Sequence, residues 1–393
     1  MSIALNNSKL RPVNHVSDRA VLPIEKDKST SLINISNDSP LLKEKNELFL
    51  NSVHHFRAIA ILFIVAGHCF GISGLEFNSP VEKVIANLLT GGTVLFVFIS
   101  GFLFHHAFYK KYQYKNFVIG KIKTVLIPYV LLGALPVFFF VFRRDGGWDG
   151  YFLPNGNGLF SEYFVPILKY YWTGSFLTAY WYVPFIITTF ILSPLHFWFV
   201  KSKPSFQFGI TFFLCIASLL IHRPVDNLNT LQSFIYFTPI YLIGILCSVY
   251  KNRIYFSLSG KEHILLALII ALAYLQSTLG IVGNYHKDIF EYGGFDIMFV
   301  QKIIMCLLFM VFLQRFNTIN IKLIHILAAT SFAIFFLHPF MLWEIKRTFG
   351  KFIAFNSWVA FSFYVMIIVV VCICIAQISK RLLPRYSRFL IGY

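Results

Sequence analysis

The stretch HHFRAIAILFIVAGHCFGISG, residues 54–74, is an apolar run long enough to cross a bilayer as a helix, which needs about 20 mostly apolar residues. Two ionisable residues, Arg57 and His68, interrupt it. They lie eleven positions apart, close to three helical turns, so their side chains share one face about 16 Å apart along the axis. Because an ionisable group inside lipid is costly, its presence there indicates a function.

The rest of the chain has the same apolar character. Of 393 residues, 57% are hydrophobic and only 13% are charged, whereas soluble domains average roughly 25% charged residues. Most of the chain therefore avoids water, and a soluble enzyme is excluded. The net charge of +17 resides largely in loops between apolar runs. This pattern is typical of positive-inside topology and argues against a nucleic-acid partner.

Ten windows approach spanning length, so we predict an all-α, polytopic membrane protein with about ten transmembrane helices. The window at 206–221 is the weakest. The even count and the Lys and Arg bias of alternate loops place both termini in the cytosol. The windows are 56–75, 84–108, 124–142, 180–200, 206–221, 231–250, 264–282, 297–313, 323–343 and 357–379.

The ends of the chain differ from this body. Residues 1–51 are rich in Ser, Asn and Lys and predict a cytosolic, largely disordered tail. Residues 52–380 form the transmembrane domain, and residues 381–393 form a short cytosolic tail. All six cysteines lie in apolar runs without ligand spacing. We therefore expect neither disulfides nor a metal site.

The geometry of the first helix supports a catalytic hypothesis. With the amino terminus inside, Arg57 lies at the cytosolic surface, where it can hold an anionic cofactor, and His68 lies near mid-membrane, where it can act as a general base. Two alternatives stay open. Arg57 can be a snorkelling positive-inside anchor, and His68 can be a hydrogen-bonded packing residue.

Two other features carry candidate binding residues. The outward loop at 143–179 is long and aromatic, and Trp148 beside Asp149 suits sugar recognition, although an interfacial aromatic belt explains it equally well. Lys302, in the eighth predicted helix, is expected to snorkel outward, to pair with Asp296 or to face an acceptor cavity.

Several short motifs, in order, resemble those of the acyltransferase-3 family of membrane O-acyltransferases. The first is the Arg followed by ten residues and a His. Next comes GGTVLFVFISGFLF at 91–104, which contains Ser100. The stretch YWYVPFI at 180–186 contains Trp181, and FFLHPF at 335–340 contains His338. The resemblance covers about residues 53–380, nearly everything except the amino-terminal tail.

The resemblance implies transfer of an acyl group, most often acetyl from acetyl-CoA, to a hydroxyl of a cell-surface or lipid-linked glycan at the bacterial inner membrane. Arg57 and His68 then carry over as the required pair, with His68 as general base. Ser100 carries over as part of the active site, although such hydroxyls also bond their own backbone. The partners implied are acyl-CoA, a saccharide acceptor and the lipid bilayer, with no tightly bound cofactor and no nucleic acid.

Coenzyme A is polyanionic, so its phosphates need cations at the inner surface. Arg57 and four lysines provide them, although ordinary positive-inside charge also explains the lysines. The acceptor is expected to contact Trp148, Asp149, Trp181 and His338. The four lysines are Lys110, Lys111, Lys121 and Lys123.

Two further classes of function use the same multispanning body. A transporter or lipid-linked sugar flippase requires acidic residues within the spans, yet the windows contain none, and acids such as Glu76 and Asp296 lie only at their edges. A non-catalytic partner in polysaccharide assembly requires that Arg57 and His68 be dispensable.

Overall fold

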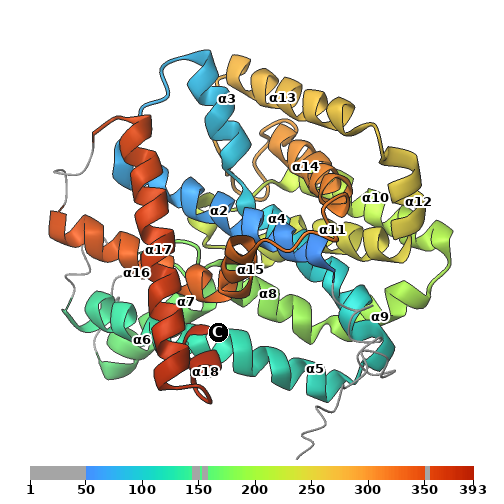
Figure 1. Ribbon diagram of the computed structural model, residues 1–393. Coiled ribbons are helices and arrows are strands. Elements are labelled where there is room, and N and C mark those ends of the chain that lie inside the picture. The colour runs from blue at the N-terminus through green and yellow to red at the C-terminus, as the bar shows by residue number, and fades with distance from the viewer. Residues whose placement is uncertain (1–49, 144–150, 153–157, 350–354) are drawn as a thin grey trace, which may run out of the picture. The chain divides into compact units, whose positions relative to one another are not determined.

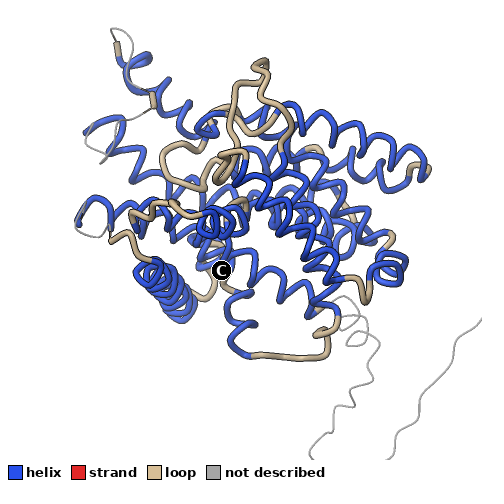
Figure 2. Tube along the Cα trace, turned by 90° about the horizontal axis from the view of Figure 1, so that it is seen from above, coloured by secondary structure: helices blue, strands red, loops and turns tan. Residues whose placement is uncertain are grey.

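The computed structural model of the protein describes residues 50–143, 151–152, 158–349 and 355–393. Within these ranges every regular element is a helix, and the one extended pairing is an isolated bridge between Arg223 and His286. Figure 2 shows the helices joined by loops. The all-α prediction is confirmed for this part of the chain. The predicted tail at 1–51 lies outside it except for its last two residues.

Seven helices in the described chain are long and apolar enough to cross a membrane, and three bent pairs raise the number to as many as 10. The prediction of about ten spans matches the upper end of this range, and the weak window at 206–221 is a continuous helix. The seven are α2 (Asn51–Ser73), Pro80–Lys111, Tyr114–Arg143, α10 (Pro204–Ile221), α11 (Thr230–Val249), α14 (Ile297–Gln314) and α17 (Trp358–Leu382).

The three bent spans have local causes. A proline at the second position of α9 (Ser193–Lys201) sets it at 55° to α8 (Tyr182–Ile191). Gly260, with φ of +84°, turns the chain by 86° between α12 (Lys251–Leu258) and α13 (Glu262–Thr278). The third pair, α15 (Lys322–Ala329) and α16 (Ser331–Phe349), meets at 68° across Thr330.

Two of the long spans are composite. Pro80–Lys111 contains α3 (Pro80–Leu89), a break at Thr90 and Gly91, α4 (Gly92–Leu103) and two short turns, η1 (Phe104–Phe108) and η2 (Tyr109–Lys111). Tyr114–Arg143 contains α5 (Tyr114–Lys121), η3 (Ile122–Leu126), α6 (Ile127–Phe138) and η4 (Phe139–Arg143). The remaining short elements are η5 (Phe160–Phe164), α7 (Val165–Thr173), η6 (Val225–Asn227) and α18 (Ser387–Ile391).

Helix α2 lies in the middle of this bundle, in contact with α4, α14, α15, α16 and α17 (Figure 1). Such a position needs small residues where backbones approach closely. Helices α4 and α11 approach each other closely, because a Cβ at Gly101 would overlap the Tyr241 carbonyl and one at Gly244 would overlap the Phe98 carbonyl. These two glycines therefore set the distance between the helices.

We expect Gly244→Ala to lower the free energy of unfolding by about 1–3 kcal/mol, because the added methyl forces two helix backbones apart. The matched control is Gly209→Ala in α10, where a Cβ meets nothing within 4 Å. Thermal unfolding of both variants in one detergent tests this. Equal midpoints would show that the α4–α11 contact tolerates separation.

Candidate active site

Two cavities lie along α2, one toward each end. The Arg57 cavity has a volume of about 440 Å³ and is lined by Arg57, Ser100, Lys121, Tyr182, Lys380 and Arg388, among others. The His68 cavity has a volume of about 540 Å³ and includes His68, Thr93, Thr178, Trp181 and Arg223 in its lining. Both volumes suit small-molecule ligands. The two residues that the sequence grouped on one helix face therefore serve different cavities.

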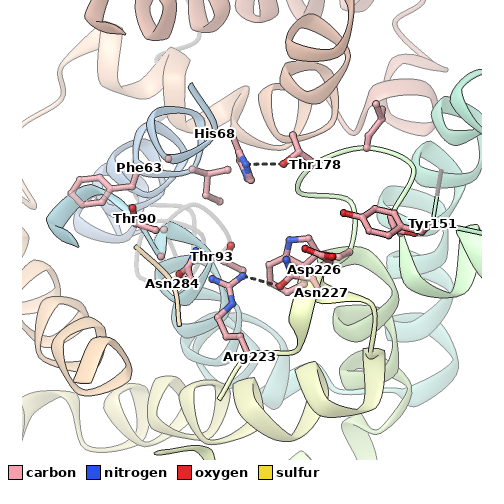
Figure 3. Close-up of a pocket in the computed structure, with 18 of the residues that line it drawn as sticks. Phe63, His68, Thr90, Thr93, Tyr151, Thr178, Arg223, Asp226, Asn227 and Asn284 are labelled. Carbon is pink, nitrogen blue, oxygen red and sulfur yellow. Dashed lines mark hydrogen bonds between the residues drawn. The ribbon is translucent and has the colours of Figure 1, made fainter. Parts of the chain in front are cut away.

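Thr178 holds the His68 side chain at the cavity wall. Its Oγ1 atom lies 2.8 Å from His68 Nδ1. Figure 3 marks this hydrogen bond with a dashed line. When Nδ1 carries the hydrogen and donates it to this hydroxyl, Nε2 has a free lone pair, the form that a general base needs. The next residue, Ala179, has φ of +66°, rare for a residue other than glycine. The residue after Thr178 therefore adopts a rare backbone conformation next to the contact between Thr178 and His68.

His338 lies behind His68, where it is completely buried. The two imidazole rings have centroids 5.6 Å apart. His338 Nδ1 donates to the Ile334 carbonyl at 2.8 Å, and its Nε2 has no partner among the described residues. His338 is not in the lining of either cavity and contacts His68, and its expected contact with the acceptor stays a prediction.

The Arg57 cavity holds the other two expected catalytic residues. The Arg57 guanidinium donates to Ser331 Oγ at 2.9 Å and lies 5.6 Å from the centre of the Phe332 ring. Ser100 and Tyr182 line the same cavity as Arg57. Arg57 and Ser100 therefore share one cavity.

This cavity is strongly basic. A neighbouring hollow of about 390 Å³ shares Lys121 and Arg388 with it, and neither lining contains an aspartate or glutamate. Three of the four predicted lysines line one or both hollows, and Lys110 does not. Lys121 places its ammonium 4.7 Å from the centres of the Phe108 and Phe190 rings. The cations of the combined hollow are Arg57, Lys111, Lys121, Lys123, Lys380 and Arg388.

Sequence reasoning missed Lys380 and Arg388, which come from the carboxyl-terminal end of α17 and from α18. Residues 381–393 were expected to be a short tail, and in the structure α18 packs against α6 and α17. Lys380 lies 4.3 Å from the centre of the Tyr393 ring. No local pattern separates these cations from ordinary positive-inside charge.

Only a thin wall separates the two cavities. Trp181 lines the His68 cavity, and the next residue, Tyr182, lines the Arg57 cavity. On α4, Thr93 lines the His68 cavity and Phe96 lines the Arg57 cavity, and these two residues are about one helical turn apart. The cavities thus adjoin each other at the beginnings of α8 and α4.

The predictions for Lys302 are wrong. Its side chain is completely buried, and its ammonium donates to the carbonyls of Asn87 at 2.9 Å and Leu88 at 2.7 Å. These carbonyls lie at the carboxyl end of α3, where a cation is favourable. Lys302 therefore stabilises the break at Thr90 and Gly91, both of which line the His68 cavity. Asp296 instead caps α14 and accepts a hydrogen bond from Tyr236 at 2.7 Å.

Of the expected acceptor residues, Trp181 lines the His68 cavity, and Trp148 and Asp149 lie outside the described residues. The structure adds polar residues that sequence reasoning missed. They come from the segments that follow α10 and α13, where polar residues in loops gave no distinguishing signal. They are Arg223, Asp226, Asn227 and Asn284.

The segment after α10 has an unusual backbone. His222, Asp226 and Asn227 all have positive φ, at 59°, 48° and 57°. Between them Arg223 is 5% exposed, and its guanidinium lies 4.8 Å from the centre of the Trp181 ring. His286 is bound to this segment through Nδ1, which donates to the Pro224 carbonyl at 2.6 Å. Such conformations persist where surrounding contacts hold them, often at functional sites.

With this geometry established, the comparisons identify the class of protein. The chain belongs to the acyltransferase-3 family, because residues 50–377 match the family described as "Acyltransferase domain". It is thus an integral multi-pass membrane protein of an acyltransferase family. No solved structure matches the chain with significance.

Individual proteins that the chain matches along most of its length share little sequence identity with it. The chain is 21% identical over 358 residues to proteins of Staphylococcus aureus strains Mu50 and MSSA476, a match that covers 86% of this chain and 94% of each relative. Both are named "Probable poly-beta-1,6-N-acetyl-D-glucosamine export protein". The export function in this name is that of the relatives.

Acid should destabilise the Arg223 segment. Burial, followed by the charge of Arg223, lowers the pKa of His286 from 6.5 to about 4, so the folded state favours the neutral ring. Its contribution to stability is therefore complete above pH 6.5 and is lost as the pH falls toward 4. We expect the Tm of His286→Gln to fall less over this interval than the wild-type Tm. The control is the exposed His263→Gln, and identical pH profiles for all three proteins would contradict the expectation.

Proposed function

We propose that the protein is a membrane O-acyltransferase that takes an acyl group, most simply acetyl, from acyl-CoA and transfers it to a hydroxyl of a cell-surface or lipid-linked glycan. The observation that carries the proposal is the pair of adjoining cavities, one basic and one containing His68. The donor would occupy the Arg57 cavity and the acceptor the His68 cavity. With the amino terminus in the cytosol, the Arg57 cavity opens to the cytosolic face of the bacterial inner membrane.

The character of each cavity supports this assignment. Coenzyme A carries several phosphate charges, and the combined basic hollow provides six cations without a carboxylate in its lining. The His68 cavity instead combines the Trp181 ring with hydroxyl and amide side chains such as Thr93 and Asn284. An aromatic face beside hydrogen-bonding groups is what a sugar ring requires.

The chemistry needs only a base and an activated acyl group. His68 Nε2 removes the proton of an acceptor hydroxyl, whose oxygen attacks the thioester carbonyl carbon. The carbon–sulfur bond then breaks, and the departing thiolate takes the proton from His68. The Thr178 hydroxyl accepts a hydrogen bond from the N–H at His68 Nδ1 and so leaves Nε2 as the basic nitrogen. The ester product and free coenzyme A balance the reaction.

A second candidate function, polysaccharide export, is favoured by the name of the relatives. Export needs a passage continuous across the membrane and wide enough for a glycan. In the described residues, Trp181 and Tyr182 stand between the two cavities, so both functions require this wall to open. Group transfer requires an opening wide enough only for the acyl end of the donor, whereas export requires one wide enough for a polymer.

We expect His68→Ala and Arg57→Ala to abolish transfer of labelled acetyl from acetyl-CoA to membrane glycan, with a loss of at least about 100-fold for the base. Membranes with matched expression of each variant provide the measurement. The control is His263→Ala, which alters an exposed histidine. Equal labelling by all four proteins would overturn the acetyltransferase proposal and bring export forward.

Thr178 is predicted to be a positioning residue. Thr178→Val should lower kcat by about 10–100-fold with little change in KM for acetyl-CoA, by analogy with groups that orient catalytic ligands. Thr178→Ser should restore most of the activity. The control is Thr188→Val, because Thr188 donates only to the Pro184 carbonyl of its own helix. An unchanged kcat and pH–rate profile in Thr178→Val would remove Thr178 from the mechanism.

A further inference from the structure

Arg223 is a buried cation that the mechanism above does not use. It lines the His68 cavity, and Figure 3 shows it with Asn227 on the wall that faces His68 and Thr178. One guanidinium nitrogen, Nη2, donates to Asn227 Oδ1 at 3.2 Å. The Nε atom has no hydrogen-bond partner among the described residues. Arg223 thus retains hydrogen-bonding capacity at a site removed from water.

The charge of Arg223 also lacks a direct counter-ion. The described residues place no carboxylate within ion-pair distance of it, although Asp226 lines the same cavity. Asp296, which is close enough to influence Arg223, is held by Tyr236 and by the backbone N–H of Phe299. Burying a charge without a direct counter-ion is costly, and an anionic ligand on Arg223 would offset that cost.

The guanidinium is held firmly in place. It stacks 4.8 Å from the centre of the Trp181 ring and 5.6 Å from that of Phe237. The Arg223 carbonyl accepts the Lys287 N–H at 3.0 Å, and Gln232 in turn donates to the Lys287 carbonyl at 2.9 Å. A preorganised planar fork suits a carboxylate or phosphate, which accepts two parallel hydrogen bonds.

A second feature of the same wall favours an anion. Helix α4 begins at Gly92, its preceding residue Gly91 supplies no side-chain cap, and Gly91, Gly92 and Thr93 all line the cavity. The first N–H groups of a helix carry partial positive charge and bind anionic groups. They add to the attraction that the Arg223 charge exerts.

We propose that Arg223 binds a negatively charged group, a carboxylate or a phosphate, carried by the saccharide acceptor in the His68 cavity. A ligand that spans the cavity then places its anionic group on Arg223 and a hydroxyl at His68 Nε2. Arg223 thereby selects acidic over neutral saccharides and sets which hydroxyl is acylated. The assignment of the ligand as acceptor rests on the proposed function, and the binding of an acidic sugar does not.

The test is direct binding to the full chain in uncharged detergent, without acyl donor. Calorimetric titration with glucuronate, glucose 1-phosphate and glucose distinguishes a carboxylate, a phosphate and a neutral sugar. We expect one or both anionic sugars to bind at least about 10-fold more tightly than glucose, and binding to weaken as salt is raised. Arg223→Gln should abolish this preference, and Arg223→Lys should retain part of it.

The control variant is Arg253→Gln, which removes an exposed arginine of α12. A thermal unfolding midpoint of Arg223→Gln close to that of the wild type shows that the variant is folded, and Arg223→Lys provides the comparison if it is not. Equal affinity for glucose and both anionic sugars, no binding of either anionic sugar to the wild type, or an unchanged preference in Arg223→Gln would each overturn the proposal. Because no acyl group is present, failure of acyl transfer leaves this outcome unaffected.

Discussion

The Lys302 ammonium is completely buried and donates to two backbone carbonyls at the end of α3. This interaction illustrates a constraint on the whole structure, which is that buried polar groups need hydrogen-bond partners within the protein. A polar group removed from water must find a partner inside the protein, and in a bilayer it has no other source. Here the partner is a helix end, and the contact allows α3 to stop and α4 to begin at the wall of the His68 cavity.

The same constraint explains the arrangement of the other cations. Arg57 contacts Ser331 and the Phe332 ring. Lys121 lies against two phenylalanine rings. Arg223 contacts the Trp181 ring and Asn227. Aromatic faces satisfy part of each charge and leave hydrogen bonds available for ligands. In the basic hollow, where no aspartate or glutamate lines the wall, cations held in this way attract anions.

Two such cavities adjoining each other are suited to moving a small group between two ligands. The wall between them is formed by neighbouring residues, Trp181 and Tyr182, at the start of a bent span. In the proposed reaction, the donor and the acceptor would meet at this wall. This arrangement agrees with membership of an acyltransferase family.

The sequence by itself determined the helical class, the approximate positions of the spans, and Arg57 and His68 as residues of interest, because hydropathy and helical period are local properties. Ser100 came from the resemblance of short motifs to those of the family. It also identified three of the lysines that line the basic hollow. Only the tertiary structure decided that Arg57 and His68 face different cavities and that Lys302 binds carbonyls. Thr178, Arg223, Lys380 and Arg388 were likewise invisible in the sequence. Their roles depend on contacts between segments that are distant in the chain. Only the packing of the helices determines which partner lies next to a buried polar group.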